Sequence, residues 1–446
     1  MKVKVLSRNP DEHLRETKRD IHKVQRNYDR NEHPFEAARE YMAAVRNVKL
    51  TRIFAKPFIH NLEGHKDGVS CVAKHPGKLS NLLSGSFNGE VIIWNLPTAK
   101  AERTILAHDG IVRGIAFDNE GEHFFTVGDD TAIKLWKTYP NDDEEIETPV
   151  NTIITKDPIS GISHHKSTKE YVTSSDNIVS LWEETRNTSL KEITWGNDRI
   201  HDIKFNNVQT NLFASCVSNR DVILYDIRNK APIRAVTLDL KANKLCWNPM
   251  EAYTFTTANE DFTSFTFDIR QFSKPVNIHM DHVGAVTDID YSPTGKEFIT
   301  ASFDRTIRIF ETSKGHSREI YHTKRMQIVT CVAWSLDNKY VISGSDEMNL
   351  RVWKSNASEK LGALKPRERA ALNYSSALID KFAAHPQVKR IARHRHVPKP
   401  IYKAQAEQKS IREREKRKEA NRRRHSKPGS VPYVAERAKH IVDVKE

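Results

Sequence analysis

The sequence has few cysteines and no long apolar segment. Its 446 residues include four cysteines that lie far apart and form no CxxC pair: Cys71, Cys216, Cys246 and Cys331. Each lies in an apolar stretch typical of a strand, so we expect buried free thiols rather than disulfides or metal ligands. No segment approaches the ~18 consecutive apolar residues of a membrane span, and the first residues lack the apolar core of a signal peptide. We therefore expect a protein of the cytosol or nucleus that binds no membrane.

Motifs of catalysis are also absent. The chain has no Gly-rich phosphate loop, no nucleophile elbow and no paired metal-ligand spacing. His394 and His396 flank Arg395, but no further Cys or His lies at a spacing that suits a metal ion. These absences predict a protein that is not an enzyme and has no small-molecule substrate, no cofactor and no metal site.

Positive charge is concentrated at one end of the chain. The net charge is +13, yet residues 364–446 contain 23 basic and 9 acidic residues, so the rest of the chain carries −1. This asymmetry predicts a neutral platform with a detached extension that seeks polyanions.

A repeat of about 40 to 50 residues organises the rest of the chain. Seven times, a short apolar run ends in an aromatic residue six places after a small polar residue or a glutamate. The spans are Asn88–Trp94, Asp130–Trp136, Asp176–Trp182, Asn219–Tyr225, Asp261–Phe267, Asp304–Phe310 and Glu347–Trp353. A fixed period of this size indicates units that bury their faces only against their neighbours.

The first repeat shows the pattern of a blade. Gly64-His65 precedes one strand, Asn88-Gly89 makes a hairpin turn, and the run ending at Trp94 returns. The pattern resembles WD40 repeats over about residues 52–353, and it implies a seven-bladed all-β propeller. The seventh outer strand can only come from before Gly64, so we expect residues 52–58 to close the ring by pairing with the last blade.

Histidines and aspartates recur once in several blades. In WD40 blades a loop His and a turn Asp join a Ser or Thr and the Trp in a buried network, so the resemblance implies a structural role rather than catalysis. The matching residues are His65, His108, His282, Asp130 and Asp304. No matching His precedes Tyr225, Phe267 or Trp353 in blades four, five and seven.

Two short motifs on neighbouring blades are similar to the WDxR box of substrate receptors for cullin-four ubiquitin ligases. They are residues 225–228 (YDIR) and 267–270 (FDIR). In that family the arginine contacts the adaptor protein, which implies this role for Arg228 and Arg270. Ordinary blade ends with solvated arginines are the alternative.

The ends of the chain flank the propeller. We expect a polar arm over residues 1–50 with a short helix over 36–45 and no core of its own, the propeller over 51–354, and a basic helical domain over 355–446. Pro366 is suited to a first helical turn, and Ala370, Tyr374, Leu378 and Phe382 follow as one apolar stripe. This stripe is expected to pack against the propeller rim rather than form a ligand groove.

The cations beyond this stripe are candidates for binding RNA phosphates. A helix over residues 412–424 has no apolar stripe, and a Glu413–Arg417 pair supports it by only ~0.2–0.5 kcal/mol. Nuclear import through residues 416–424 is compatible with RNA binding, and a solvated, partly disordered helix is the alternative. The candidate residues are Lys389, Arg390, Arg393, Arg395, Arg412, Arg414, Lys416, Arg417, Lys418, Arg422, Arg423 and Arg424.

Five stretches distributed from end to end resemble the Sof-one-like family of nucleolar WD-repeat proteins. They are residues 1–8 (MKVKVLSR), 248–252 (NPMEA), 344–349 (GSDEMN), 389–396 (KRIARHRH) and 428–432 (PGSVP). The resemblance implies a nuclear, nucleolar component of the small-subunit processome. It also implies association with precursor ribosomal RNA, a box C/D small nucleolar ribonucleoprotein and other processome proteins. Animal members have also been linked to the cullin-four ligase, which leaves a substrate receptor as the alternative function.

Overall fold

The computed structural model describes residues 34–139 and 148–445, which form two compact units. One unit combines the N-terminal residues up to Ile53 with Gly362–His394. The other comprises Phe54–Leu361 and Arg395–Glu446. The first thirty-three residues of the expected polar arm lie outside the described residues.

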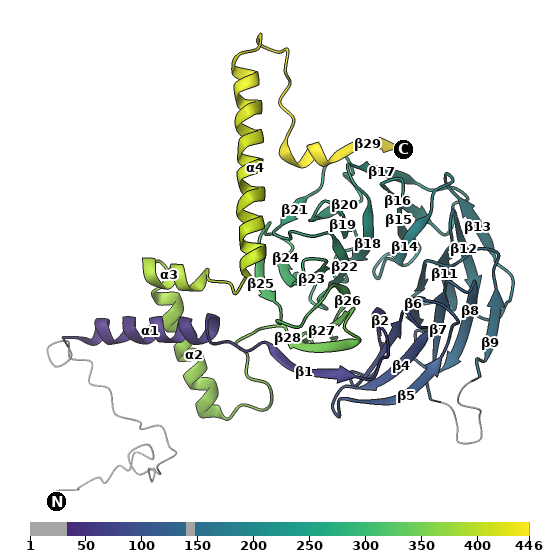
Figure 1. The fold of residues 1–446 in the computed structure, drawn as a ribbon, viewed down its shortest axis with the longest axis horizontal. Helices are drawn as coiled ribbons and strands as arrows, with labels where there is room; N and C mark the ends of the chain where they lie inside the picture. Colours follow the sequence, from purple (N-terminus) through teal and green to yellow (C-terminus); the bar gives the residue numbers. More distant parts are fainter. Residues whose placement is uncertain (1–33, 140–147, 446) are drawn as a thin grey trace, which may run out of the picture. The chain divides into compact units, whose positions relative to one another are not determined.

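The second unit is a ring of seven antiparallel sheets, as the repeats predict (Figure 1). Blades one to three contain β2 (Val69–Lys74), β3 (Asn81–Ser86), β4 (Glu90–Asn95) and β5 (Lys100–Leu106); β6 (Val112–Phe117), β7 (His123–Gly128), β8 (Ala132–Lys137) and β9 (Asn151–Ile154); and β10 (Gly161–His164), β11 (Glu170–Ser174), β12 (Ile178–Glu183) and β13 (Lys191–Thr194). Blades four and five contain β14 (Ile200–Phe205), β15 (Leu212–Val217), β16 (Asp221–Asp226) and β17 (Arg234–Leu238); and β18 (Ala242–Trp247), β19 (Thr254–Asn259), β20 (Thr263–Asp268) and β21 (Asn277–Met280). Blades six and seven contain β22 (Val286–Tyr291), β23 (Glu297–Ser302), β24 (Ile307–Glu311) and β25 (Ser317–Tyr321); and β26 (Val329–Trp334), β27 (Tyr340–Ser345) and β28 (Asn349–Lys354).

In blades one, two, four, five and six, the polar residue that opens the repeat span accepts a backbone hydrogen bond in the hairpin before the third strand. In blade two, Asp130 Oδ1 accepts a hydrogen bond from the Ala132 amide at 3.2 Å, and Thr131 between them has a φ of 61°. In blade six, Asp304 Oδ1 accepts from the Thr306 amide at 2.9 Å in the same way. A short carboxylate therefore holds the backbone in a left-handed turn that L-residues otherwise avoid.

The last blade is completed by an N-terminal strand. β1 (Phe58–Glu63) pairs antiparallel with β28, and Leu62 opposite Leu350 is fully buried. The predicted closure of the ring is confirmed, but the expected strand over 52–58 is wrong by several residues. Residues up to Arg52 belong instead to helix α1 (Glu36–Arg52).

The fourth blade has an outer strand that the sequence reasoning missed. β29 (Ile441–Lys445) pairs antiparallel with β17, with Val444 opposite Val236, and makes this sheet five-stranded. Ile441 and Val444 pack against the core of blades four and five. The extension is therefore not detached as expected, because its last residues are part of the propeller.

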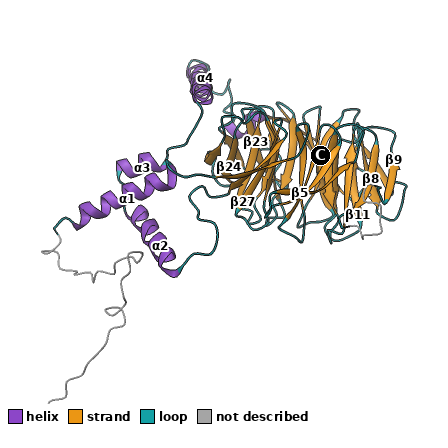
Figure 2. Ribbon diagram, turned by 60° about the horizontal axis from the view of Figure 1, so that its bottom comes forward, coloured by secondary structure: helices purple, strands orange, loops and turns teal. Residues whose placement is uncertain are grey.

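The first unit is a small helical cluster (Figure 2). α1 packs with α2 (Pro366–Lys381) and α3 (Pro386–Ala392) around Val45, Val48 and Val388. The N-terminal segment thus has a core, contrary to expectation, and its helix runs past residue 45.

The predicted stripe on α2 is corrected in the same way. Leu378 is buried, and Phe382 packs in this helical core rather than against the propeller rim. Tyr374 is 53% exposed, and Ala370 is exposed too. The expected packing partner was wrong because the apolar face that contacts Phe382 belongs to α1, more than 300 residues earlier in the chain.

Two other expectations concern burial and membranes. Cys71, Cys216 and Cys331 are buried and Cys246 is partly buried, all four as free thiols. Among the helices that the structure describes, none is both long and apolar enough to cross a membrane.

Candidate functional site

The basic residues 399–424 form one long helix, α4 (Lys399–Arg424). Proline lies in its first turn, where the missing amide hydrogen costs nothing, and three arginines lie in its last turn, where cations favour the helix dipole. The expected Glu413–Arg417 ion pair does not form. Glu413 instead lies 4.0 Å from Lys409, and Arg417 Nε donates to the Glu413 carbonyl at 3.3 Å.

The N-terminal half of α4 is fixed to the propeller. Ile401 is buried, and Gln405 Nε2 donates to the Asp281 carbonyl at 2.5 Å. Arg412, a candidate for RNA binding, is half-buried, and its Nη1 lies 3.2 Å from Met280 Sδ. Its guanidinium is therefore already engaged with the propeller. These contacts place the start of the helix against β21 and the residues that follow it.

The C-terminal half of α4 is held by the returning chain. Lys416 pairs with Glu436 at 2.9 Å, and Lys439 pairs with Glu419 at 2.6 Å. Arg423 lies over the ring of Tyr433 with its guanidinium 4.8 Å from the ring centroid. The returning residues include the short helix η1 (Glu436–His440) and lead to β29 (Figure 1). The basic helix is therefore anchored at both ends on the propeller unit.

An exposed row of cations remains on α4 after these contacts. Arg414, Lys418 and Arg422 are exposed, and among the described residues none of their side chains joins an ion pair. They are four residues apart, so they lie on one face of the helix at intervals of about 6 Å. We call Arg414, Lys418 and Arg422 the cationic row. Arg424, the last residue of α4, is also exposed.

The other candidate cations belong to different parts of the structure. Lys389 and Arg390 on α3 and Arg393 at its end are exposed in the helical unit. Arg395 belongs to the propeller unit and is half-buried. The predicted set is thus divided between the two units.

The two arginine boxes have the same backbone geometry on blades four and five. The Ile227 amide donates to the Asn211 carbonyl at 3.0 Å, and the Ile269 amide donates to the Tyr253 carbonyl at 2.9 Å. Both boxes follow a third strand, so they lie on the same side of neighbouring blades. This equivalence is what a paired docking site on one face requires.

The two arginine side chains differ within this shared geometry. The Arg270 guanidinium lies 3.8 Å from the centroid of the Tyr253 ring, and its Nε lies 3.6 Å from Asp268. Arg228 is exposed, and no ion pair of its guanidinium is found among the described residues. Arg228 is the more available of the two for a partner.

A polar network fills the expected positions in blade two. His108 is buried, with Nδ1 2.8 Å from Asp130 and Nε2 2.8 Å from Thr126 Oγ1. Trp136 Nε1 donates to the same Thr126 hydroxyl at 2.9 Å. The histidine thus serves packing and hydrogen bonding within one blade, as predicted.

Blades one and six keep parts of the same network. His282 Nδ1 lies 3.0 Å from Asp304 in blade six, where Phe310 replaces tryptophan. His65 Nε2 lies 2.5 Å from Ser84 Oγ in blade one, but its Nδ1 has no hydrogen-bond partner among the residues that the structure describes. Burial lowers the pKa of His65 to about 4, so its ring is neutral at pH 7.

The centre of the ring holds a cavity of about 380 Å³ lined by charged residues. Burial alone would lower the pKa of Lys244, but Asp288 and Asp202 raise it. Lys74 also pairs with Asp290 at 2.5 Å. Charged groups of this channel therefore interact between blades: Lys244 of blade five with carboxylates of blades four and six, and Lys74 of blade one with Asp290 of blade six.

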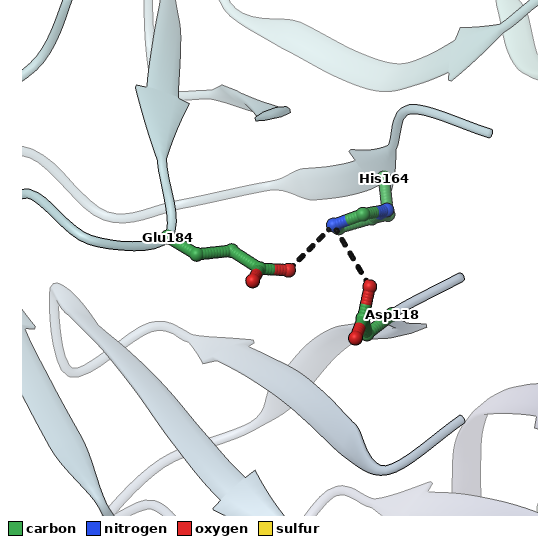
Figure 3. Close-up of side chains that lie close together, drawn as sticks. All are labelled: Asp118, His164 and Glu184. Carbon is green, nitrogen blue, oxygen red and sulfur yellow. Dashed lines mark hydrogen bonds and ion pairs between the residues drawn. The ribbon is translucent and has the colours of Figure 1, made fainter. Parts of the chain in front are cut away.

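A further cluster lies at the edge of this cavity, and spacing in the sequence did not reveal it. Asp118, His164 and Glu184 each offer one oxygen or nitrogen atom within 4.8 Å of the others (Figure 3). They are separated by 46 and 20 residues, so a search for short metal-binding spacings overlooks them. The signal that could have found them is a comparison of equivalent positions across the repeats.

Comparison with known proteins identifies the family. Residues 355–441 match the Sof1-like domain, and residues 56–95, 99–137, 273–311 and 314–354 match the WD domain, G-beta repeat. Families of this kind are typically non-catalytic scaffolds. The chain is 55% identical over 447 residues to DDB1- and CUL4-associated factor 13 of Xenopus tropicalis, and 54% identical over 444 residues to the protein of that name in Homo sapiens. Both alignments cover 100% of each chain.

A fungal relative agrees. Protein SOF1 of Saccharomyces cerevisiae is 39% identical over 465 residues, which cover 99% of this chain and 94% of that protein. The agreement extends through the propeller and the basic helical region alike. The chain therefore belongs to the Sof1-like family of WD-repeat proteins, the family that its five sequence stretches resemble.

Proposed function

We propose that this protein is a scaffold of ribosome assembly, a component of the small-subunit processome needed for maturation of small-subunit ribosomal RNA in the nucleolus. In this proposal the propeller binds other processome proteins, and α4 binds precursor ribosomal RNA or a small nucleolar ribonucleoprotein. The observation that carries the proposal is the cationic row, which lies within the region matched by the Sof1-like domain. Similarity to Protein SOF1 over nearly the whole chain supports it.

The physical basis is the contrast between the row and its surroundings. Each of the three cations is solvated and can neutralise one phosphate with release of bound counterions. The paired cations of the same helix, such as Lys416 with Glu436, must first break a contact. Phosphate binding should therefore depend most on Arg414, Lys418 and Arg422.

Crosslinking in cells tests this proposal. RNA crosslinked to the full chain is sequenced and compared with RNA from the variant Arg414→Gln, Lys418→Gln, Arg422→Gln. A matched control replaces three exposed propeller lysines, Lys100, Lys230 and Lys274, with Gln. Because residues 416–424 are also expected to direct nuclear import, every chain carries an added import signal.

Two outcomes decide the matter. Precursor ribosomal RNA recovered with the native chain and the control, but not with the row variant, supports the proposal. Equal recovery from all three chains, or recovery of unrelated RNA alone, contradicts it.

A substrate receptor of a cullin-four ubiquitin ligase is the second candidate. The observation that favours it is a turn shared by the two arginine boxes on neighbouring blades, in which Asp226 and Asp268 accept hydrogen bonds at 2.9 Å from the Arg228 and Arg270 amides. The vertebrate relatives carry a name that couples them to DDB1 and CUL4. In this candidate function Arg228 and Arg270 contact the ligase adaptor.

Adaptor capture by purified chains tests the second candidate. Arg228→Ala with Arg270→Ala should abolish capture, and Arg228→Ala alone should weaken capture more than Arg270→Ala alone, because Arg270 is engaged with Tyr253. Arg186→Ala at the corresponding edge of blade three is the matched control. Capture that survives the double substitution would show that the boxes are ordinary blade ends.

A further inference from the structure

Blade three differs from the other blades at two equivalent positions. The innermost strands of blades two, four, five, six and seven end in an aromatic residue, namely Phe117, Phe205, Trp247, Tyr291 and Trp334. In blade one this residue is Lys74, and in blade three it is His164. In blades two to seven the amide of the residue after the innermost strand donates to the first residue of the second strand, as the Asp118 amide does to His123 and the His165 amide to Glu170. The equivalence of these positions is therefore structural as well as sequential.

The second position follows the third strand of each blade. The backbone amide at this position donates to the carbonyl of the residue before the second strand in all seven blades. In the six blades other than blade three, the residue at this position has an aliphatic or hydroxyl side chain. These residues are Leu96, Thr138, Ile227, Ile269, Thr312 and Ser355. Blade three has Glu184, whose amide donates to the Lys169 carbonyl at 3.0 Å. Both exceptions of this blade are residue types that bind metals.

The two exceptional side chains meet a carboxylate from blade two. His164 Nε2 lies 2.9 Å from Glu184 Oε1 and 3.8 Å from Asp118 Oδ1 (Figure 3). The three side chains are 5%, 13% and 7% exposed, so their charges are largely withdrawn from water. Two carboxylates and one imidazole thus converge on one point between the blades.

The hydrogen bonds of His164 show that a positive charge is needed there. Its Nδ1 lies 2.8 Å from the His165 carbonyl, and a carbonyl can only accept, so Nδ1 carries the hydrogen. In a neutral ring Nε2 then carries no hydrogen, and its lone pair faces two carboxylates, which is a repulsive arrangement.

We propose that Asp118, His164 and Glu184 bind a Zn²⁺ ion that joins blade two to blade three. Ligand atoms about 2.0–2.2 Å from a tetrahedral ion are roughly 3.4 Å apart, and the observed 2.9 and 3.8 Å lie on either side of this value. The imidazole disfavours Ca²⁺ and Mg²⁺, which prefer oxygen ligands. Asp118 and His164 also line the central cavity, which provides a path for the ion and space for a water as fourth ligand.

The position of the site gives the ion a structural role. β10 and β13 of blade three have four residues each, whereas most strands of the propeller have six. A short blade forms fewer ladder hydrogen bonds with which to hold its place in the ring. An ion shared with the end of β6 would compensate at the edge nearest the channel.

Metal binding by the full chain tests this inference independently of RNA or adaptor binding. The purified protein is stripped with a chelator and titrated with Zn²⁺, and with Co²⁺ for its visible spectrum. The variant His164→Phe, Glu184→Ile introduces the residues of blade four and should fold. Asp118→Asn keeps the shape of the site if that variant does not fold. His316→Gln removes an exposed His–Asp281 pair and is the matched control.

The expected result is one Zn²⁺ per native or control chain, with a melting temperature that rises on loading. The site variants should lose affinity by more than about 100-fold, since even outer partners of metal ligands contribute about 10–100-fold. A native chain that binds neither Zn²⁺ nor Co²⁺ would show that a proton holds the cluster together. That result, or equal binding by native and site variants, would overturn the proposal.

Discussion

Two strands from opposite ends of the chain join the propeller, and they do different work. β1 supplies the missing fourth strand of blade seven, whereas β29 adds a fifth strand to a blade that is already complete. Leu62 on β1 is fully buried, while Val442 on β29 is 58% exposed. Each strand pairs with its neighbour in an antiparallel ladder, so the two strands differ in side-chain burial and not in the kind of backbone hydrogen bonding.

The difference shows which strand maintains the fold. Without β1 the ring would be left with an open edge at β28, and the apolar side chains packed against Leu62 would be exposed. Without β29 the edge of blade four would be exposed, but the circle of blades would remain closed. We infer that β1 holds the ring together and that β29 holds the far end of the basic segment in place.

Deleting the two strands separately tests this comparison with the largest expected effect. Removal of residues 58–63 should lower the free energy of unfolding by more than about 4 kcal/mol, since one buried leucine alone contributes about 3–5 kcal/mol. Removal of residues 441–446 should lower it by about 1–3 kcal/mol, because Ile441 and Val444 are only partly buried. Urea unfolding followed by circular dichroism measures both. Equal losses would show that the two strands are equivalent.

A pair of point substitutions sharpens the same comparison. Leu62→Ala should cost about 3 kcal/mol through the lost contacts and the cavity it leaves. Val442→Ala on β29 should change stability by less than about 0.5 kcal/mol, as is usual at exposed positions. Melting temperatures of the two variants provide the measurement, and a larger loss for Val442→Ala would reverse the assigned roles.

A third prediction, with a smaller expected effect on stability, concerns acid pH. The ring should lose stability in acid through a buried histidine, whereas the basic segment should not contribute to this loss. Burial lowers the pKa of His279 to about 4, against 6.5 in the unfolded chain, although the Lys314 carbonyl acts to raise it. The unfolded chain binds the extra proton between these values, so stability falls as pH decreases through this window. Between pH 7 and pH 5 the His279 imidazole should lower the free energy of unfolding by about 2 kcal/mol.

The chain without residues 441–446 is the control for this prediction. It should lose stability with the same slope, because His279 belongs to the ring and hydrogen-bonds to Thr266 of blade five. His279→Gln should reduce the slope in both chains. A slope that is unchanged by this substitution would mean that His279 does not carry the acid sensitivity.

Most of the ring was predictable because its signals are local and repeated. An aspartate that caps a turn and an aromatic residue six places later, as in Asp130–Trp136, report one blade without reference to distant residues. The need for a seventh outer strand likewise predicted closure by the N-terminal segment. The register was wrong because helix α1 extends to Arg52, and no proline or glycine over residues 36–52 marks where it ends.

The parts that sequence reasoning missed depend on contacts between distant residues. The core of the helical unit joins Val45 and Val48 to Val388, and neither segment alone shows its partner. β29 has an alternating pattern of only five residues, too short to indicate a strand by itself. The cationic row was within the predicted set, but the sequence did not show that Arg412 and Lys416 are engaged while Arg414 is exposed.

The salt dependence of RNA affinity tests the central claim most directly, namely that a closed ring carries an exposed row of cations that grips phosphates. Binding of single-stranded and duplex RNA is measured from 50 to 200 mM salt for the native chain, for Arg414→Gln, Lys418→Gln, Arg422→Gln, and for the propeller control with Lys100, Lys230 and Lys274 replaced. The row variant should reduce the slope of log affinity against log salt by about 2–3, whereas the control should match the native chain. A native slope near zero, or equal slopes for all three chains, would contradict the account.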